Sequence, residues 1–114
     1  MYNVYIISSE INSKKLYKIG YTRKLVSERI KQFKTGNASE FEIVDTFKSK
    51  WGTKIEKSLH KHFRFNKIKG EWFELDMDQV MDFKVICGKY HNNFELLDKY
   101  NTYVIDRGGL SKIK

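Results

Sequence analysis

Two helical patterns in the sequence carry charged side chains at spacings that suit chemistry on an anionic group. In the first, Leu25–Lys34, Arg29 falls inside an arc of apolar residues when about 100° is assigned to each residue. Burying a guanidinium among apolar side chains costs several kcal/mol unless an anion meets it. The alternative is an Arg whose stem packs on the core while its head reaches water or a carboxylate. The pattern makes Arg29 a candidate for contact with an anion.

The second helical pattern, Lys50–Phe63, separates a basic face from an apolar face. Its apolar arc holds Trp51, Ile55, Leu59 and Phe63, and the opposite arc holds Lys50, Lys54, Lys57 and Lys61. A lysine row at this spacing could follow a phosphate backbone, and the alternative is an ordinary solvated face.

Glu56 lies at the margin of the apolar arc, among lysines, with His60 one helical turn later. We expect Glu56 to serve as a ligand or an ion-pair partner. A metal site shared by His60 and His62 is not expected, since residues two apart on a helix point about 200° apart. Cys87, without a His or Asp pattern around it, is expected to be a core residue rather than a nucleophile.

Composition favours one folded, basic domain. The 114 residues carry a net charge of +8, and 15% of them are aromatic. Residues 1–75 hold 16 Lys and Arg against 8 Asp and Glu, whereas residues 76–114 hold 6 against 6. A surplus of positive charge that is confined to one segment is typical of a protein that binds a polyanion. One cysteine and no long apolar run predict a cytoplasmic protein that is neither secreted nor embedded in a membrane.

The residue types predict an α+β fold. Strands are expected over Tyr2–Ser8, Leu16–Tyr21 and Phe41–Phe47, the last with Phe41, Ile43 and Phe47 on one face. The polar segment Ser9–Lys15 should form a hairpin loop. Thr22 should cap the first helix, and Gly36-Asn37 should end it.

The later part of the chain is predicted to be a short strand followed by helices. Gly70–Leu75 forms the strand or arm, which carries Trp72 and Phe73; one of these should be core and the other could stack on bases. Asp76-Met-Asp-Gln79 resembles a capping box that opens a helix through Ile86, closed by Gly88. Phe94–Tyr100 is a further helical stretch, before a polar tail from Asp106. The charge change predicts two segments, 1–76 and a helical extension, 77–114.

Several short motifs, taken in order, resemble one family. Asn3-Val4-Tyr5 stands where Gly-Ile-Tyr would, and Lys18-Ile19-Gly20 where Tyr-Ile-Gly would, in the GIY-YIG nuclease superfamily. The phage-type branch, often described as a DNA-binding domain, has Lys-Ile-Gly as its second motif. Its further matches, within residues 2–75, are Gly20-Tyr21-Thr22, Arg29, Thr35-Gly36-Asn37, Glu56 with His60 and Phe63, and Gly70-Glu71-Trp72-Phe73.

The resemblance implies a small antiparallel sheet flanked by helices that hydrolyses a DNA phosphodiester. Tyr5 would bind or deprotonate the attacking water, Lys18 would assist it and hold the phosphate, and Arg29 would stabilise the developing charge. Glu56 would hold one divalent ion, Mg²⁺ or Mn²⁺, whose other ligands are water and phosphate oxygens. The expected contacts to DNA, most simply double-stranded, come from Lys50, Lys54, Lys57, His60, Lys61, Lys67 and Lys69.

Three departures from the family pattern bear on catalysis. The first glycine is Asn3, and Phe33 stands where many relatives carry His or Tyr. A late polar residue has two candidates, Asn66 and Glu71. A non-catalytic DNA-binding module on the same fold and a basic protein-interaction domain, dimeric through residues 77–100, remain the alternatives.

Overall fold

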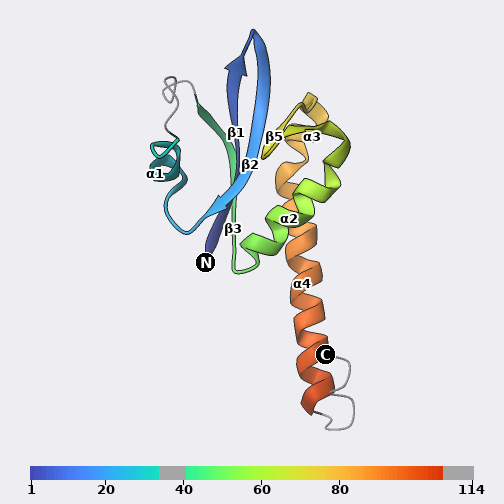
Figure 1. Cartoon of the computed structure of the whole chain (residues 1–114). Helices are drawn as coiled ribbons and strands as arrows, with labels where there is room; N and C mark the ends of the chain where they lie inside the picture. The colour runs from blue at the N-terminus through green and yellow to red at the C-terminus, as the bar shows by residue number, and fades with distance from the viewer. Residues whose placement is uncertain (34–40, 107–114) are drawn as a thin grey trace.

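The computed structural model describes residues 1–33 and 41–106, with side chains through residue 100. It has the predicted α+β fold, a five-stranded antiparallel sheet flanked by helices, with strand order β3-β1-β2-β5-β4 (Figure 1). The strands are β1 (Tyr2–Ile11), β2 (Lys14–Thr22), β3 (Glu42–Ser49), β4 (Lys67–Lys69) and β5 (Trp72–Phe73). The helices are α1 (Val26–Ile30), α2 (Gly52–His62), η2 (Arg64–Asn66), α3 (Met77–Met81) and α4 (Phe83–Asp106).

The β1–β2 hairpin extends well beyond the two predicted strands. Ile11 pairs with Lys14, so the connection consists of Asn12 and Ser13, which have φ of 53° and 65°. Two consecutive residues with positive φ give a turn whose twist matches that of the strands. The predicted loop Ser9–Lys15 is therefore wrong, because its polar residues lie on an exposed part of the ladder that still forms pairs.

A β-bulge in β3 corrects the prediction that Phe41, Ile43 and Phe47 share one face. Ile6 pairs with Asp45 and Ile7 with Ile43, so β3 has one extra residue at this point. An extra residue reverses the alternation of side chains that follow. Phe41 therefore packs beside Tyr5 and Ile7 on one face of the sheet, and Phe47 packs on the other.

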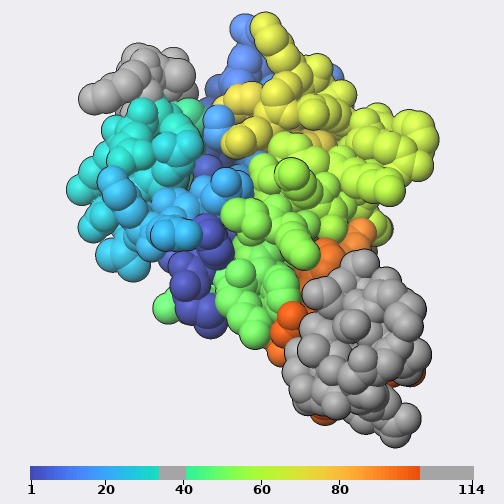
Figure 2. Space-filling view, turned by 60° about the horizontal axis from the view of Figure 1, so that its bottom comes forward, coloured from blue at the N-terminus to red at the C-terminus, as the bar shows by residue number. Residues whose placement is uncertain are grey.

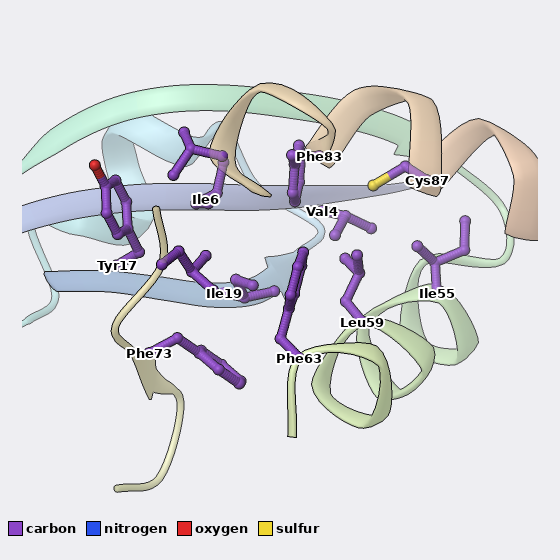
Figure 3. Close-up of a cluster of buried hydrophobic side chains, with 12 residues drawn as sticks. Val4, Ile6, Tyr17, Ile19, Ile55, Leu59, Phe63, Phe73, Phe83 and Cys87 are labelled. Atoms are coloured by element: carbon purple, nitrogen blue, oxygen red, sulfur yellow. The ribbon is translucent and has the colours of Figure 1, made fainter. Parts of the chain in front are cut away.

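The main core lies between the sheet and helices α2 and α4 (Figure 3). Val4 and Ile6 from β1 meet Ile55 and Leu59 from α2, all fully buried. Gly52 begins α2 directly against Tyr2, where a Cβ would overlap that side chain. This close approach sets where α2 crosses the edge of the sheet.

The opposite face is covered by the short α1. Val26 is buried there against Tyr5 and Ile7. α1 is one turn rather than the predicted Leu25–Lys34, and Leu25 is 65% exposed. Thr22 does not cap it; Thr22 ends β2, and its hydroxyl accepts a hydrogen bond from the Lys24 amide at 3.1 Å. The predicted end at Gly36-Asn37 lies outside the described residues.

The C-terminal helices complete the main core. The predicted capping box is present, with Asp76 and Gln79 bonded reciprocally at the start of α3. Gly88 does not end a helix, since α4 continues past it and past Phe94–Tyr100. Phe83 and Cys87 are fully buried in the same cluster as Val4, so the segments on either side of residue 76 share one core.

Candidate functional site

The strand register gathers the predicted site residues on the face that α1 covers. Tyr5 pairs with Gly20, and Ile7 pairs with Lys18, which in turn pairs with Trp72 of β5. Paired residues point to the same side of a sheet, and so do residues two apart on one strand. Tyr5, Lys18 and Trp72 therefore share this face.

Gly20 leaves the space that the Tyr5 hydroxyl fills. A Cβ at residue 20 would lie 2.5 Å from the Tyr5 hydroxyl oxygen and 3.1 Å from Glu71 Oε1. Glu71 is held beside β2 by a backbone bond, because the Ile19 amide donates to its carbonyl oxygen at 3.1 Å. The phenol and the carboxylate thus converge over one glycine.

The Tyr5 hydroxyl is held protonated. Burial raises its pKa, and the negative charges of Glu71 and Glu56 add to this effect. Hydrogen bonding and charge from the Arg29 guanidinium act in the opposite direction without cancelling it. Tyr5, Arg29, Glu56 and Glu71 are therefore close enough to influence one titration.

Arg29 and Lys18 lie over the same aromatic ring. Their charged groups are 5.1 Å and 4.6 Å from the Phe33 centroid. Arg29 is half-buried, and its guanidinium donates to Gln32 Oε1 at 2.9 Å. Lys18 Nζ also lies 3.9 Å from Glu71 Oε1. Two cations facing one site are well placed to meet an anionic group.

Aromatic rings form one wall of this site. Phe33 meets Phe41 edge to face at 5.5 Å, and Phe41 stacks on Trp72 at 6.1 Å. Trp72 is half-buried on this face, whereas Phe73 is fully buried in the main core, which confirms that one of the pair is core. Apolar walls strengthen the electrostatic interactions of Lys18 and Arg29 by lowering the local dielectric.

Glu56 enters the site from α2, held by His60. His60 Nε2 lies 3.1 Å from Glu56 Oε2 and 2.9 Å from the carbonyl oxygen of Ile19. Both neighbours are acceptors, so Nε2 carries a proton in either charge state of the ring. Burial lowers the pKa of His60, but the bonds to Glu56 and Ile19 outweigh it and raise the pKa above its ordinary value. His60 fixes one oxygen of Glu56.

The space-filling view places α1 and α2 on two sides of the strands that carry Tyr5 and Lys18 (Figure 2). Within residues 1–33 and 41–106, no group of three or more His, Cys, Asp and Glu side chains could hold a metal ion. Glu56 is accordingly not part of a larger cluster of metal-ligating side chains among the described residues. Mg²⁺ is often bound in this way, by one or two carboxylates with waters and phosphates.

The lysines predicted to contact DNA divide into three pairs. Lys50 forms an ion pair with Glu95 at 3.3 Å, and Lys54 lies 5.8 Å from the Phe94 centroid, so both lean toward α4. Lys57 and Lys61 are exposed on the open side of α2. The edge strand β4 exposes Lys67 and Lys69.

Comparison with known proteins gives one match. The chain matches the T5orf172 domain over residues 3–87. It belongs to the T5orf172 domain family. This phage-associated domain occurs in nuclease and DNA-binding families, and it points to a function related to nucleic acids. No curated protein and no solved structure matches the chain.

The T5orf172 match includes Val80, Phe83 and Cys87, which the main core also includes. Burial raises the pKa of the Cys87 thiol to about 12, so this residue is the expected core side chain. Among the described residues, no helix of this T5orf172 protein is long and apolar enough to cross a membrane.

Two site residues make contacts that the sequence analysis did not predict. Of the two late polar candidates, Glu71 lies beside Tyr5, whereas Asn66 bonds to Gln79 and Glu74 away from the site. His60, which was predicted to contact DNA, has its Nε2 against Glu56 and the carbonyl oxygen of Ile19. The i, i+4 spacing of Glu56 and His60 was the available signal for that pair.

Proposed function

We propose that this protein is a divalent-metal-dependent DNA endonuclease of the GIY-YIG type. One observation carries the proposal: the Tyr5 hydroxyl packs against Gly20, beside Glu71, where it is influenced by Arg29 and Glu56. The four residues around this phenol come from β2, α1, α2 and the turn between β4 and β5, and folding alone gives no reason for them to converge there. Their side-chain chemistry matches what hydrolysis of a phosphodiester requires.

The two cations bind the phosphate. Arg29 offers several N–H donors in a planar fork, which suits the non-bridging oxygens on which charge develops. Lys18, over the same Phe33 ring, adds a second positive charge to hold and orient the group. Phosphate would also give these cations a closer anionic partner than Glu71, which stands 3.9 Å from Lys18.

Tyr5 and Glu71 handle the proton of the attacking water. Tyr5 positions the water through the phenolic oxygen. Tyr5 first loses the phenolic proton and then accepts a proton from the water. Glu71 Oε1 is the adjacent carboxylate that can receive the phenolic proton. Because the pKa of Tyr5 is raised, the phenolate is a minor species, and the positive charge of Arg29 increases its fraction.

Glu56 is the residue that would hold Mg²⁺ or Mn²⁺. His60 binds Oε2, and no described hydrogen bond occupies Oε1, so one carboxylate oxygen remains for an ion. When bound, the ion supplies positive charge to the leaving oxygen.

Nicking of supercoiled plasmid in Mg²⁺ or Mn²⁺ tests the proposal. Glu56→Gln should abolish cleavage while affinity for DNA holds or rises, since a negative charge facing phosphate is removed. Tyr5→Phe should slow cleavage and spare binding. Glu10→Gln, an exposed carboxylate at the far end of the β1–β2 hairpin, is the matched control and should cleave like wild type.

If wild type and Glu56→Gln nick plasmid equally with several divalent ions, the endonuclease proposal is wrong. The protein would then be a non-catalytic DNA-binding module. Failure of wild type to bind DNA at physiological salt would favour the basic protein-interaction domain.

A further inference from the structure

Phe65 projects from the protein although it is a large apolar residue. It is 87% exposed, in the middle of the single turn η2 that follows α2. Phe63, two residues earlier, is 2% exposed in the main core. An aromatic ring held almost wholly in water gains nothing for folding, so its exposure calls for a partner outside the fold.

The turn that presents Phe65 is rigidly anchored on both sides. The Asn66 amide donates to the Phe63 carbonyl at 2.8 Å, and the Glu74 amide donates to the Asn66 carbonyl at 2.9 Å. The Asn66 side chain donates to the Glu74 carbonyl at 3.0 Å and accepts from Gln79 at 3.1 Å. A ring on an anchored turn loses little conformational freedom when it binds.

A cation lies over the ring of Phe65 on the helix side. The Arg64 guanidinium lies 4.5 Å from the Phe65 centroid and donates to the Lys61 carbonyl at 2.9 Å. Lys57 and Lys61 of α2 and Arg64 of η2 are exposed and lead toward Phe65, at spacings of four and three residues. A row of cations that ends in an exposed aromatic suits a nucleic acid strand, whose phosphates and bases it can contact in turn.

Beside Phe65 a depression of about 560 Å³ separates η2 from the start of α3. Glu74 and Asp76 line it, together with Asn66, Lys67 and Gln79. Both carboxylates are engaged, Glu74 with Lys14 at 3.2 Å and Asp76 with the Gln79 amide at 2.8 Å. These acceptors disfavour a phosphate in the depression and suit the amino groups of a base edge.

We propose that Phe65 stacks on an unpaired base of the DNA that the lysine row of α2 holds. This inference rests on the proposed function only for its DNA binding, not for cleavage. It assigns a substrate preference to the protein: DNA with a base out of the stack, at a bulge, a mismatch or a single-stranded segment.

The stacking position lies near the proposed site of cleavage. Glu56 and His62 are six residues apart on α2, about 9 Å along its axis, and Phe65 lies beyond the helix end. That span equals roughly three base pairs of a duplex at about 3.4 Å each.

Binding in EDTA separates this inference from catalysis. Fluorescence anisotropy would compare a duplex with the same duplex carrying one bulged 2-aminopurine, whose emission is quenched on stacking. We expect wild type to prefer the bulged DNA and quench the probe, and Phe65→Ala to lose about tenfold in affinity for it. Phe65→Trp should retain the preference. Met81→Ala, 73% exposed on α3, is the matched control.

The salt dependence provides the second measurement. Phe65→Ala should leave the slope of log K against log salt unchanged, whereas Lys57→Gln with Lys61→Gln should flatten it by roughly 2 units. Equal affinity of Phe65→Ala and wild type for the bulged DNA overturns the stacking role and leaves the endonuclease proposal intact. Absence of any DNA binding by wild type overturns both.

Discussion

Gly20 and Tyr5 are cross-strand partners in which the glycine directly adjoins the phenol. The two pair in the β1–β2 ladder, and a Cβ on residue 20 would lie 2.5 Å from the hydroxyl oxygen and 2.7 Å from Cζ of Tyr5. Tyr5 is 1% exposed, so its ring has no room to withdraw. The glycine is thus required for the position of the hydroxyl that the proposed mechanism uses.

Gly20→Ala should displace Tyr5 and destabilise the protein. Overpacking of this kind typically costs about 1–3 kcal/mol, and we expect plasmid nicking to fall together with the melting temperature. Gly88→Ala is the control, because a Cβ there has nothing within 4 Å. In a helix interior that change should raise stability by about 0.5–1 kcal/mol. A Gly20→Ala protein with wild-type melting temperature and activity would contradict the packing argument.

Glu71→Gln should lower the pKa of Tyr5. The Glu71 charge is one cause of the raised value, after burial, so its removal increases the phenolate fraction at a given pH. Arg29→Ala should move the pKa further up, because Arg29 favours the phenolate. Carbon-13 NMR of Cζ-labelled tyrosine measures both shifts, with Tyr5→Phe assigning the signal. Identical Tyr5 titrations in wild type and both variants would show that the three groups do not interact.

The pair His60–Glu56 should make stability depend on pH. The raised pKa of His60 means that the folded protein binds this proton more tightly than the unfolded chain does. The stabilisation that this proton provides is fully present below the ordinary histidine pKa near 6.5. It is lost as pH rises through the higher pKa that His60 has in the folded protein. Urea unfolding should therefore show wild type losing stability relative to His60→Gln as pH rises above about 6.5. His62→Gln, exposed on the same helix, should retain the wild-type dependence since it leaves this pair intact.

Sequence patterns predicted the strands and helices well where burial alternates cleanly. The capping box at Asp76 and the apolar arc of α2 are local patterns, and both are present. The bulge at Ile6 and Ile7 is not local, because it depends on how β3 pairs with β1. The order of apolar and polar residues within 41–47 does not indicate the bulge.

The sequence predicted which residues belong to the candidate site better than it predicted the contacts between them. Tyr5, Lys18, Arg29 and Glu56 were all named from the sequence; Lys18 and Arg29 lie over the Phe33 ring, and Arg29 and Glu56 influence the titration of Tyr5. The role of Glu71 depends on β2 and β5 lying side by side, a contact between segments far apart in the chain. Phe65 lacked a signal because exposure is decided by the turn after α2.

A chain that ends after Asp76 should not fold. It would lack Val80, Phe83 and Cys87, which are 7%, 0% and 0% exposed in the main core. Loss of one buried Phe side chain typically costs about 3–5 kcal/mol, against a total stability of about 5–15 kcal/mol for a small domain. Circular dichroism should show no cooperative melting for this chain. A chain ending at Tyr100 keeps every core residue among those whose side chains the structure describes, and it should melt near the wild-type temperature. Cooperative melting of the shorter chain would mean that residues 1–76 form a core of their own, and the sheet with α2 would then suffice for the fold.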